Sequence, residues 1–93
     1  MIEVFDPPLY FAWRWEQNLP YVVHFYVAKQ ARSFVASLAC VKQLRAYFAE
    51  LGFHRILLNA RCEEPRIQRA IEHHFKVRSY GAADAHKFYL VEV

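Results

Sequence analysis

Residues 21–44 read YVVHFYVAKQARSFVASLACVKQL, and this stretch decides which fold the sequence can adopt. The apolar segment from Tyr21 to Ala28 predicts a central strand covered on both faces. A short basic turn follows. From Ser33, a good N-cap, apolar residues recur at intervals of three and four as far as Leu51, which predicts an amphipathic helix. A strand that leads directly into a helix N-terminus is a common phosphate-binding arrangement, because the first N–H groups of the helix point at the anion.

The rest of the chain predicts five more strands and one more helix. The strands are Ile2–Phe5, Leu9–Glu16, His54–Ala60, Lys76–Tyr80 and His86–Glu92; turns are predicted at Gln17 to Pro20, at Gly52 after the first helix, and over GAADA at 81–85. Pro65 starts the second helix, with a stripe of Ile67, Ala70, Ile71 and Phe75. The order β-β-β-α-β-α-β-β predicts a mixed, mostly antiparallel sheet with two helices packed on it. The class is α/β (α+β), in one domain of residues 1–93.

Composition excludes several classes of protein. With 93 residues, 56% hydrophobic and 17% aromatic, the chain can bury a core and is not a disordered tail. The net charge is +3, and the 12 Lys and Arg residues are interspersed with 9 Asp and Glu, so nucleic-acid binding is not indicated. No apolar run reaches the roughly 20 residues that span a bilayer, and the N-terminus lacks the features of a signal peptide. We therefore expect a cytoplasmic location and no membrane partner.

Three segments carry a resemblance to a known family: VAKQAR at 27–32 with the helix after it, LGFHRILLNA at 51–60, and EEPRIQRAIEHHFKVRSY at 63–80. They resemble the GNAT superfamily of acyl-CoA-dependent N-acyltransferases, from about the second strand of that family to its end. The resemblance implies a GNAT-like fold. It also implies an acetyl-CoA site at Val27, Lys29, Gln30, Arg32, Ser33 and Ser37.

The sequence departs from the family pattern in two places. The family's glycines would fall near Ser33, Val35 and Ser37, where this chain has none. Glycine matters there because diphosphate oxygens must approach backbone N–H groups closely. The family tyrosine that protonates the leaving thiolate, counted four residues before the pair His74-Phe75, is replaced by Ala70. These departures indicate a degenerate site without a cofactor, or one that takes acetyl-CoA if it is functional.

His24 and Tyr26 share one face of the central strand and are the candidates for a general base and a general acid near an amine. On a strand this apolar, a histidine packed in the core is the favoured interpretation. The basic turn has a similar alternative, which is an exposed turn that ends in an ordinary N-cap. For that turn, too, the absence of glycine favours the alternative.

The remaining candidates have simpler interpretations. His73 and His74 point about 100° apart on a helix, so no metal site is predicted. Cys40 and Cys62 are interpreted as reduced, packed thiols. Four arginines near the second helix alternate with acidic residues, which favours a salt-bridged face: Arg61, Arg66, Arg69 and Arg78.

The strand at 9–16 has two contrasting faces. Trp13 and Trp15, with Leu9 and Phe11, lie on one face and are interpreted as core. The opposite face is solvent or a protein interface, because its aromatic and arginine side chains suit protein contacts; it holds Tyr10, Ala12, Arg14 and Glu16.

Two hypotheses of function remain. The first is a non-catalytic structural or protein-interaction component with a protein partner or a second copy of the chain; family analogy points to a bacteriophage particle, and so to a virion, as one setting. The alternative is a small acetyl-CoA-dependent N-acetyltransferase acting on a protein or small-molecule amine. The missing glycines and Ala70 favour the first, and whether the chain is an enzyme stays open.

Overall fold

The computed structural model describes residues 1–27 and 34–93. The elements in chain order are β1 (Ile2–Asp6), β2 (Leu9–Glu16), β3 (Leu19–Val27), α1 (Phe34–Glu50), β4 (Arg55–Arg61), α2 (Pro65–His74), β5 (Lys76–Ala83) and β6 (His86–Glu92). They form one six-stranded sheet with the order β1-β2-β3-β4-β6-β5. The β3–β4 pair is parallel and the other pairs are antiparallel. The predicted element order and α+β class are confirmed.

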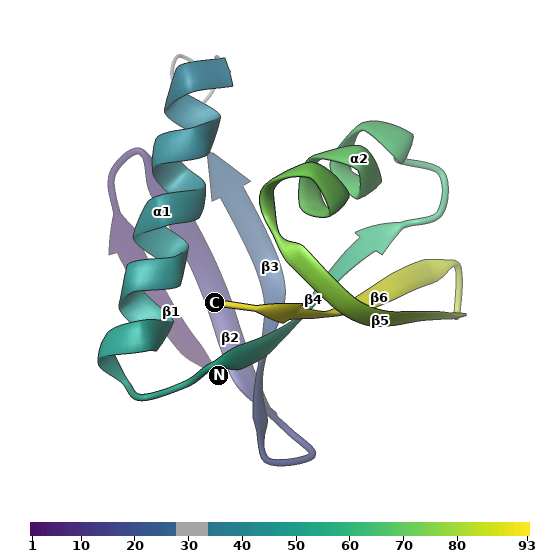
Figure 1. The fold of residues 1–93 in the computed structure, drawn as a ribbon, viewed down its shortest axis with the longest axis horizontal. Coiled ribbons are helices and arrows are strands. Elements are labelled where there is room, and N and C mark those ends of the chain that lie inside the picture. Colours follow the sequence, from purple (N-terminus) through teal and green to yellow (C-terminus); the bar gives the residue numbers. More distant parts are fainter. Residues whose placement is uncertain (28–33) are drawn as a thin grey trace.

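Both helices pack on the same face of the sheet (Figure 1). Phe48 of α1 lies against Phe11 and Trp13 of β2, with ring centroids 5.8 and 5.4 Å apart. Ile71 of α2 and Phe75, the residue just after that helix, belong to the same buried cluster. The strands contribute alternate residues because successive side chains of a strand point to opposite faces. One continuous core results, made by these residues together with Leu9, Val22, Cys40, Val41, Leu44, Ile56, Leu58, Ala60, Tyr89 and Val91.

The helix ends agree with the sequence signals. Gly52 has a φ of +87° and donates its N–H to the carbonyl of Ala49 at 3.0 Å, as expected of a residue just past a helix. Pro65 stands in the first turn of α2. Within residues 1–27 and 34–93, no helix is both long and apolar enough to cross a membrane.

Two predicted loops are shorter than expected. Residues 17–18 close the β2–β3 hairpin and residues 84–85 close the β5–β6 hairpin, each pair with positive φ. Positive φ at both central residues is the two-residue turn that matches the twist of antiparallel strands. The predicted turn at 17–20 and the predicted GAADA loop are therefore wrong beyond these pairs. Leu19 and Pro20 begin β3, and residues 81–83 end β5.

The interpretation of both tryptophans as core is half correct. Trp13 is 3% exposed, and its indole N–H donates to the Tyr47 hydroxyl at 3.1 Å. Trp15 is 56% exposed because it lies beside the hairpin turn, at the edge of the core, where its ring contacts those of Trp13 and Phe53. The first helical stripe ends early in the same way, since Leu51 lies beyond the last turn of α1 and is 51% exposed.

The prediction that the central strand is covered on both faces is also wrong. The helices cover one face of the sheet only, and His24, Phe25 and Tyr26 are exposed near the end of β3. His24 is thus not a core histidine. Its ring lies 5.8 Å from the ring of Tyr10 on the face without helices.

Candidate functional site

The site begins with an irregularity in β3. His24 pairs with Ala12 of β2, and Val22 pairs with Trp13, so Val23 is an extra residue with no partner on β2. An extra residue of this kind is a β-bulge, which bends its strand and increases the local twist. The bulge therefore turns the second half of β3 away from the direction of its first half.

The neighbouring strand β4 does not follow this turn. Tyr21 and Leu57 form the one parallel pair between β3 and β4 in the described residues, and beyond it the strands diverge (Figure 1). The amide of Asn59 bridges the start of the opening: its Nδ2 donates to the Val23 carbonyl at 3.3 Å and to the Tyr21 hydroxyl. A side chain thus replaces the ladder hydrogen bonds that the divergence removes.

A cleft of about 880 Å³ occupies the opening between the two strands and the two helices. Both strands, both helices and the first residue of β6 line it. The lining residues are 22–26 of β3; Val41 and Leu44 of α1; 58–61 of β4; Arg66, Ile67, Ala70, Ile71 and His74 of α2; Glu64 and Phe75, which flank α2; and His86 of β6.

The cleft is charged at one end and apolar along its α2 wall. Arg61 is the last residue of β4, Glu64 holds the N-cap position of α2 without a side-chain capping hydrogen bond, and Arg66 stands in the first turn of that helix. The wall made by α2 then continues through Ile67 and Ala70, both exposed, toward the buried Phe75. Charged groups gather where β4 passes into α2, and apolar groups dominate further along the helix.

The polar residues of the sheet face without helices also reach the cleft. His24 and Tyr26 line it from β3, as do Asn59 from β4 and His86 from β6. His86 Nδ1 lies 2.8 Å from the carbonyl oxygen of Asp84. A carbonyl can only accept, so Nδ1 carries the proton and Nε2 of the neutral ring is a proton acceptor.

The structure brings together some of the predicted site residues. His24 and Tyr26 lie at the cleft, and Ala70, the position of the family tyrosine, lies on the facing α2 wall. Val27 is the last residue of β3 and Ser37 falls within α1. Lys29, Gln30, Arg32 and Ser33 lie outside the described residues.

Sequence reasoning missed Asn59 and His86. Asn59 is a polar residue at a position of β4 where the neighbouring residues Leu58 and Ala60 are buried, and this was the available signal. His86 has no local signal, because its place at the cleft depends on the pairing of β6 with β4.

The other chemically interesting side chains do not form a site. The Cys40 thiol is buried in the core, and burial, with a smaller effect of the Asp6 charge, raises its pKa. The thiol of Cys62 is unpaired and exposed, which differs from the packed thiol expected. Among residues 1–27 and 34–93 there is no group of three or more His, Cys, Asp or Glu side chains that could hold a metal ion.

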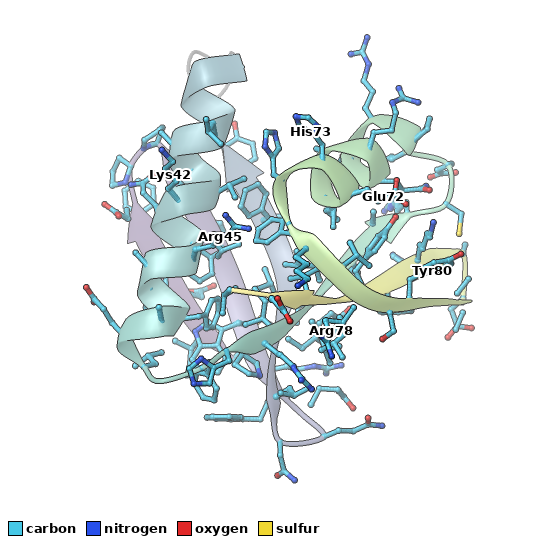
Figure 2. The ribbon with its side chains drawn as sticks, viewed as in Figure 1. Lys42, Arg45, Glu72, His73, Arg78 and Tyr80 are labelled. Carbon is cyan, nitrogen blue, oxygen red and sulfur yellow. The ribbon has the colours of Figure 1, made fainter. Side chains whose placement is uncertain are left out.

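A cluster on the side of α2 away from α1 anchors the helix to the sheet (Figure 2). Lys87 Nζ lies 3.3 Å from Glu72 Oε1 and 4.4 Å from the centre of the Tyr80 ring. On the other side of α2, Arg45 extends from α1, and its guanidinium lies 5.2 Å from the centre of the Phe75 ring. These contacts hold α2 in place on both sides of the cleft wall.

The arginines near α2 have two kinds of surroundings. Arg61 pairs with Glu63 at 3.4 Å and Arg78 pairs with Glu92 at 3.0 Å, as the interpretation of a salt-bridged face predicted. Arg66 lines the cleft. Arg61 and Arg78 thus form ion pairs, and Arg66 contributes to the candidate site.

Comparison with known proteins identifies a similar fold. Neither known protein families nor curated protein sequences match this chain. Among solved structures, the chain is similar to a protein of Bordetella pertussis assigned to the GnaT family of acetyltransferases, with a TM-score of 0.55 and 21% sequence identity over 90% of this chain. The fold is GNAT-like. The chain spans 55% of the length of that protein, so the likeness concerns the sheet and helices described above.

Proposed function

We propose that the chain is a GNAT-type protein that binds the pantetheine arm of an acyl-coenzyme A between β3 and β4 and transfers the acyl group to an amine. The observation that carries this proposal is the divergence of the two strands after Tyr21 and Leu57. A cleft of about 880 Å³ lies there instead of a continuous parallel ladder. This is the opening that an elongated ligand would need.

The chemistry of the opened strands suits such an arm. Beyond Tyr21, β3 pairs with β2 at one edge, and in the described residues it has no paired residue on β4 at the other. Backbone N–H and C=O groups at an open strand edge need partners, and an extended molecule with amide groups can supply them as an added strand does. The pantetheine arm has two amides and an extended shape.

The charged end of the cleft fits the opposite end of the same ligand. Arg61, which pairs with Glu63, and Arg66 stand where β4 passes into α2, with Glu64 also lining the cleft there. Guanidinium groups bind phosphate oxygens through charge-assisted hydrogen bonds. The basic turn predicted at 28–33 follows directly on β3, which ends at Val27.

For acyl transfer, the protein must bind the thioester and assist two proton transfers. The bound thioester supplies an activated acyl carbon. The amine must lose a proton as its nitrogen bonds to that carbon, and the departing sulfur must gain one. His24 and Tyr26 at the cleft are the candidates for these proton transfers.

A second function is favoured by a different observation. Ala70, at the position of the family tyrosine, has no group that can donate a proton, and Phe25 and Ile67, which line the same cleft, are 44% and 46% exposed. A cleft retained for contact, with a protein partner and without chemistry, would show this combination. This non-catalytic hypothesis predicts no turnover whatever the cleft binds.

Calorimetric titration with acetyl-CoA and with CoA, followed by an assay of thiol release with amine acceptors, tests both functions. Micromolar binding with thiol release supports acyl transfer. Binding without release from any amine favours the non-catalytic alternative, and no heat up to millimolar ligand overturns the acyl-CoA proposal. Ile67→Glu, which places a carboxylate on the cleft wall, should abolish binding. Leu51→Glu is the matched control, since Leu51 is similarly exposed and lies outside the cleft.

A further inference from the structure

A group of aromatic and acidic side chains lies on the sheet face without helices, near β1, and we call it the edge cluster: Glu3 and Phe5 of β1, Tyr10 of β2 and His24 of β3. Val4, between Glu3 and Phe5, packs against the core, so its two neighbours point to the opposite face. Tyr10 pairs with Phe5, and its hydroxyl donates to Glu3 Oε1 at 2.9 Å. The Tyr10 ring lies 5.8 Å from the ring of His24. Phe5 is 74% exposed and Glu3 is also exposed, so another molecule can reach both the ring and the carboxylate.

The edge cluster contains two kinds of group that attract a cation. A carboxylate attracts positive charge, and so does the face of an aromatic ring. Tyr10 donates to Oε1 of Glu3, and within residues 1–27 and 34–93 no group donates to Oε2. In the same part of the chain, no Lys or Arg forms an ion pair with Glu3 or lies over the rings of Phe5 and Tyr10.

Elsewhere in the molecule, the same combination of groups includes a cation. On the same face of the sheet, the guanidinium carbon of Arg14 lies 5.5 Å from the centre of the Tyr21 ring, and its Nη2 lies 3.4 Å from Glu16 Oε2. On the other face, Lys87 contacts Glu72 and two tyrosine rings. The edge cluster has the rings and the carboxylate, and a cation from another molecule completes it.

The edge cluster is an open surface. Glu3, Phe5 and Tyr10 do not line the cleft, and they lie on neighbouring strands of one sheet. Small ligands bind in concave sites, whereas aromatic side chains on an open surface are typical of protein interfaces. Further along this face the sheet offers apolar contact to a partner that extends beyond the cluster, through the half-buried side chains of Tyr21, Leu57, Phe88 and Leu90.

We infer that the edge cluster binds an arginine side chain of a protein partner, with the guanidinium over the rings of Phe5 and Tyr10 and hydrogen-bonded to Glu3 Oε2. Arginine suits the cluster better than lysine, because the planar guanidinium is weakly hydrated, stacks on aromatic faces and donates to carboxylates in a fixed geometry. The chain has a net charge of +3, so the attraction for a basic partner is local to the cluster. The inference goes beyond the proposed function and does not depend on what the cleft binds.

NMR titration of the whole chain with Nα-acetyl-arginine amide, at low ionic strength, tests the inference. Nα-acetyl-citrulline amide is the uncharged control of the same shape, and Nα-acetyl-lysine amide carries the same charge without the guanidinium. Binding is measured from the signals of Glu3, Phe5 and Tyr10. From one exposed cation–π contact and one surface ion pair, we expect the arginine amide to bind roughly threefold to thirtyfold more tightly than the citrulline amide, and more tightly than the lysine amide.

A second probe tests the kind of partner. A capped tripeptide with arginine between two leucines should bind more tightly than the arginine amide, because its leucines can contact the apolar side chains that continue along the sheet face. Binding of the tripeptide that is no tighter than binding of the arginine amide overturns the assignment to a protein partner.

Variants of the edge cluster locate the binding. Phe5→Leu and Tyr10→Leu keep apolar bulk and remove a ring, and Glu3→Gln removes the charge. Each should reduce the affinity for the arginine amide toward that for the citrulline amide. Tyr80→Leu and Glu50→Gln are the matched controls: Tyr80 is 69% exposed in β5, the other edge strand, and Glu50 is an exposed carboxylate at the end of α1.

The outcomes are independent of acyl-CoA binding. A preference for the arginine amide that is weakened in the three cluster variants and unchanged in the two controls supports the inference. Equal affinity for the arginine and citrulline amides overturns it, and so does the absence of a response at Glu3, Phe5 and Tyr10. Equal affinity for the arginine and lysine amides overturns the choice of a guanidinium.

Discussion

Ala85 occupies a position in a tight turn where glycine is the usual residue. It has a φ of +61° in the two-residue turn that joins β5 and β6. Non-glycine residues pay a steric cost in this region because their Cβ approaches the backbone, and glycine is the usual residue there. The Ala85 carbonyl also accepts the N–H of Cys62 at 2.9 Å, which ties the turn to the β4–α2 connection.

We predict that Ala85→Gly raises the free energy of unfolding by about 0.5–1 kcal/mol, since it removes that steric cost and keeps the backbone hydrogen bond. Urea denaturation followed by tryptophan fluorescence measures the change. Ala82→Gly, three residues earlier and within β5, should lower stability instead, because glycine weakens a strand interior. A destabilised Ala85→Gly would show that the positive φ costs nothing at this turn.

His24, in the candidate site, is a second residue whose surroundings differ from those that its sequence neighbours predict. Its neighbours are apolar, so sequence alone favoured burial. The exposure of a strand residue depends on what covers its face of the sheet, and no element in the described part of the chain covers this one. His24 lies at the cleft, its role there stays a prediction, and its surroundings were wrongly predicted.

At the scale of elements, the decisive feature is the bulge at Val23 in β3. The bulge separates the half of β3 that pairs with β4 from the half that borders the cleft. Nothing in the letters YVVHF marks Val23 as the extra residue, because a bulge is defined by the register of the partner strand. The strand was therefore predictable, and the opening beside it was not.

We predict that Asn59→Ala lowers the free energy of unfolding by about 1–2 kcal/mol, because the amide is the side-chain link between β3 and β4 where their ladder ends. Tyr21→Phe removes one of its two partners and should cost less, about 0.5–1 kcal/mol. Chemical denaturation gives both values. Titration of the same two variants with acetyl-CoA shows whether the opening between β3 and β4 keeps its shape. A neutral Asn59→Ala would mean that backbone contacts alone hold the two strands.

At the scale of the whole molecule, the core contains groups that resist ionisation. Burial is the main cause that raises the pKa of the Cys40 thiol above its ordinary value of 9.0. Burial likewise raises the pKa of Tyr89 above 10.0, although Lys87 acts against it. Both groups stay protonated in the folded chain at a pH where they ionise in the unfolded chain.

The sign of the pH dependence follows from these shifts. Because the folded pKa values are the higher ones, the stabilisation is complete below the unfolded values and is lost as the pH rises through the folded ones. We predict that the free energy of unfolding falls with rising pH above about 9, first through Cys40 and then through Tyr89. Urea titrations between pH 7.5 and 10.5 measure it. Cys40→Ala should delay the fall to about pH 10, and stability that is constant up to pH 10.5 would contradict the prediction.

The sequence by itself determined the order of the elements, their approximate bounds and the α+β class. These properties follow from local patterns: alternation in β2, three-and-four spacing in α1, Gly52 after that helix and Pro65 at the start of α2. Local patterns are set by backbone geometry within a few residues, so one chain is enough to show them. The resemblance to GNAT proteins rested on residues 27–32 with the helix after them, 51–60 and 63–80, and the fold agrees with it.

The tertiary structure alone decided where the cleft lies and which residues share it. His86 and Asn59 are far apart in sequence and meet there because β6 pairs with β4. The uncovered sheet face, the exposure of Trp15 and the opening beside Val23 likewise depend on which elements lie next to each other. Burial and divergence are relations between elements, and no single segment of the sequence contains them.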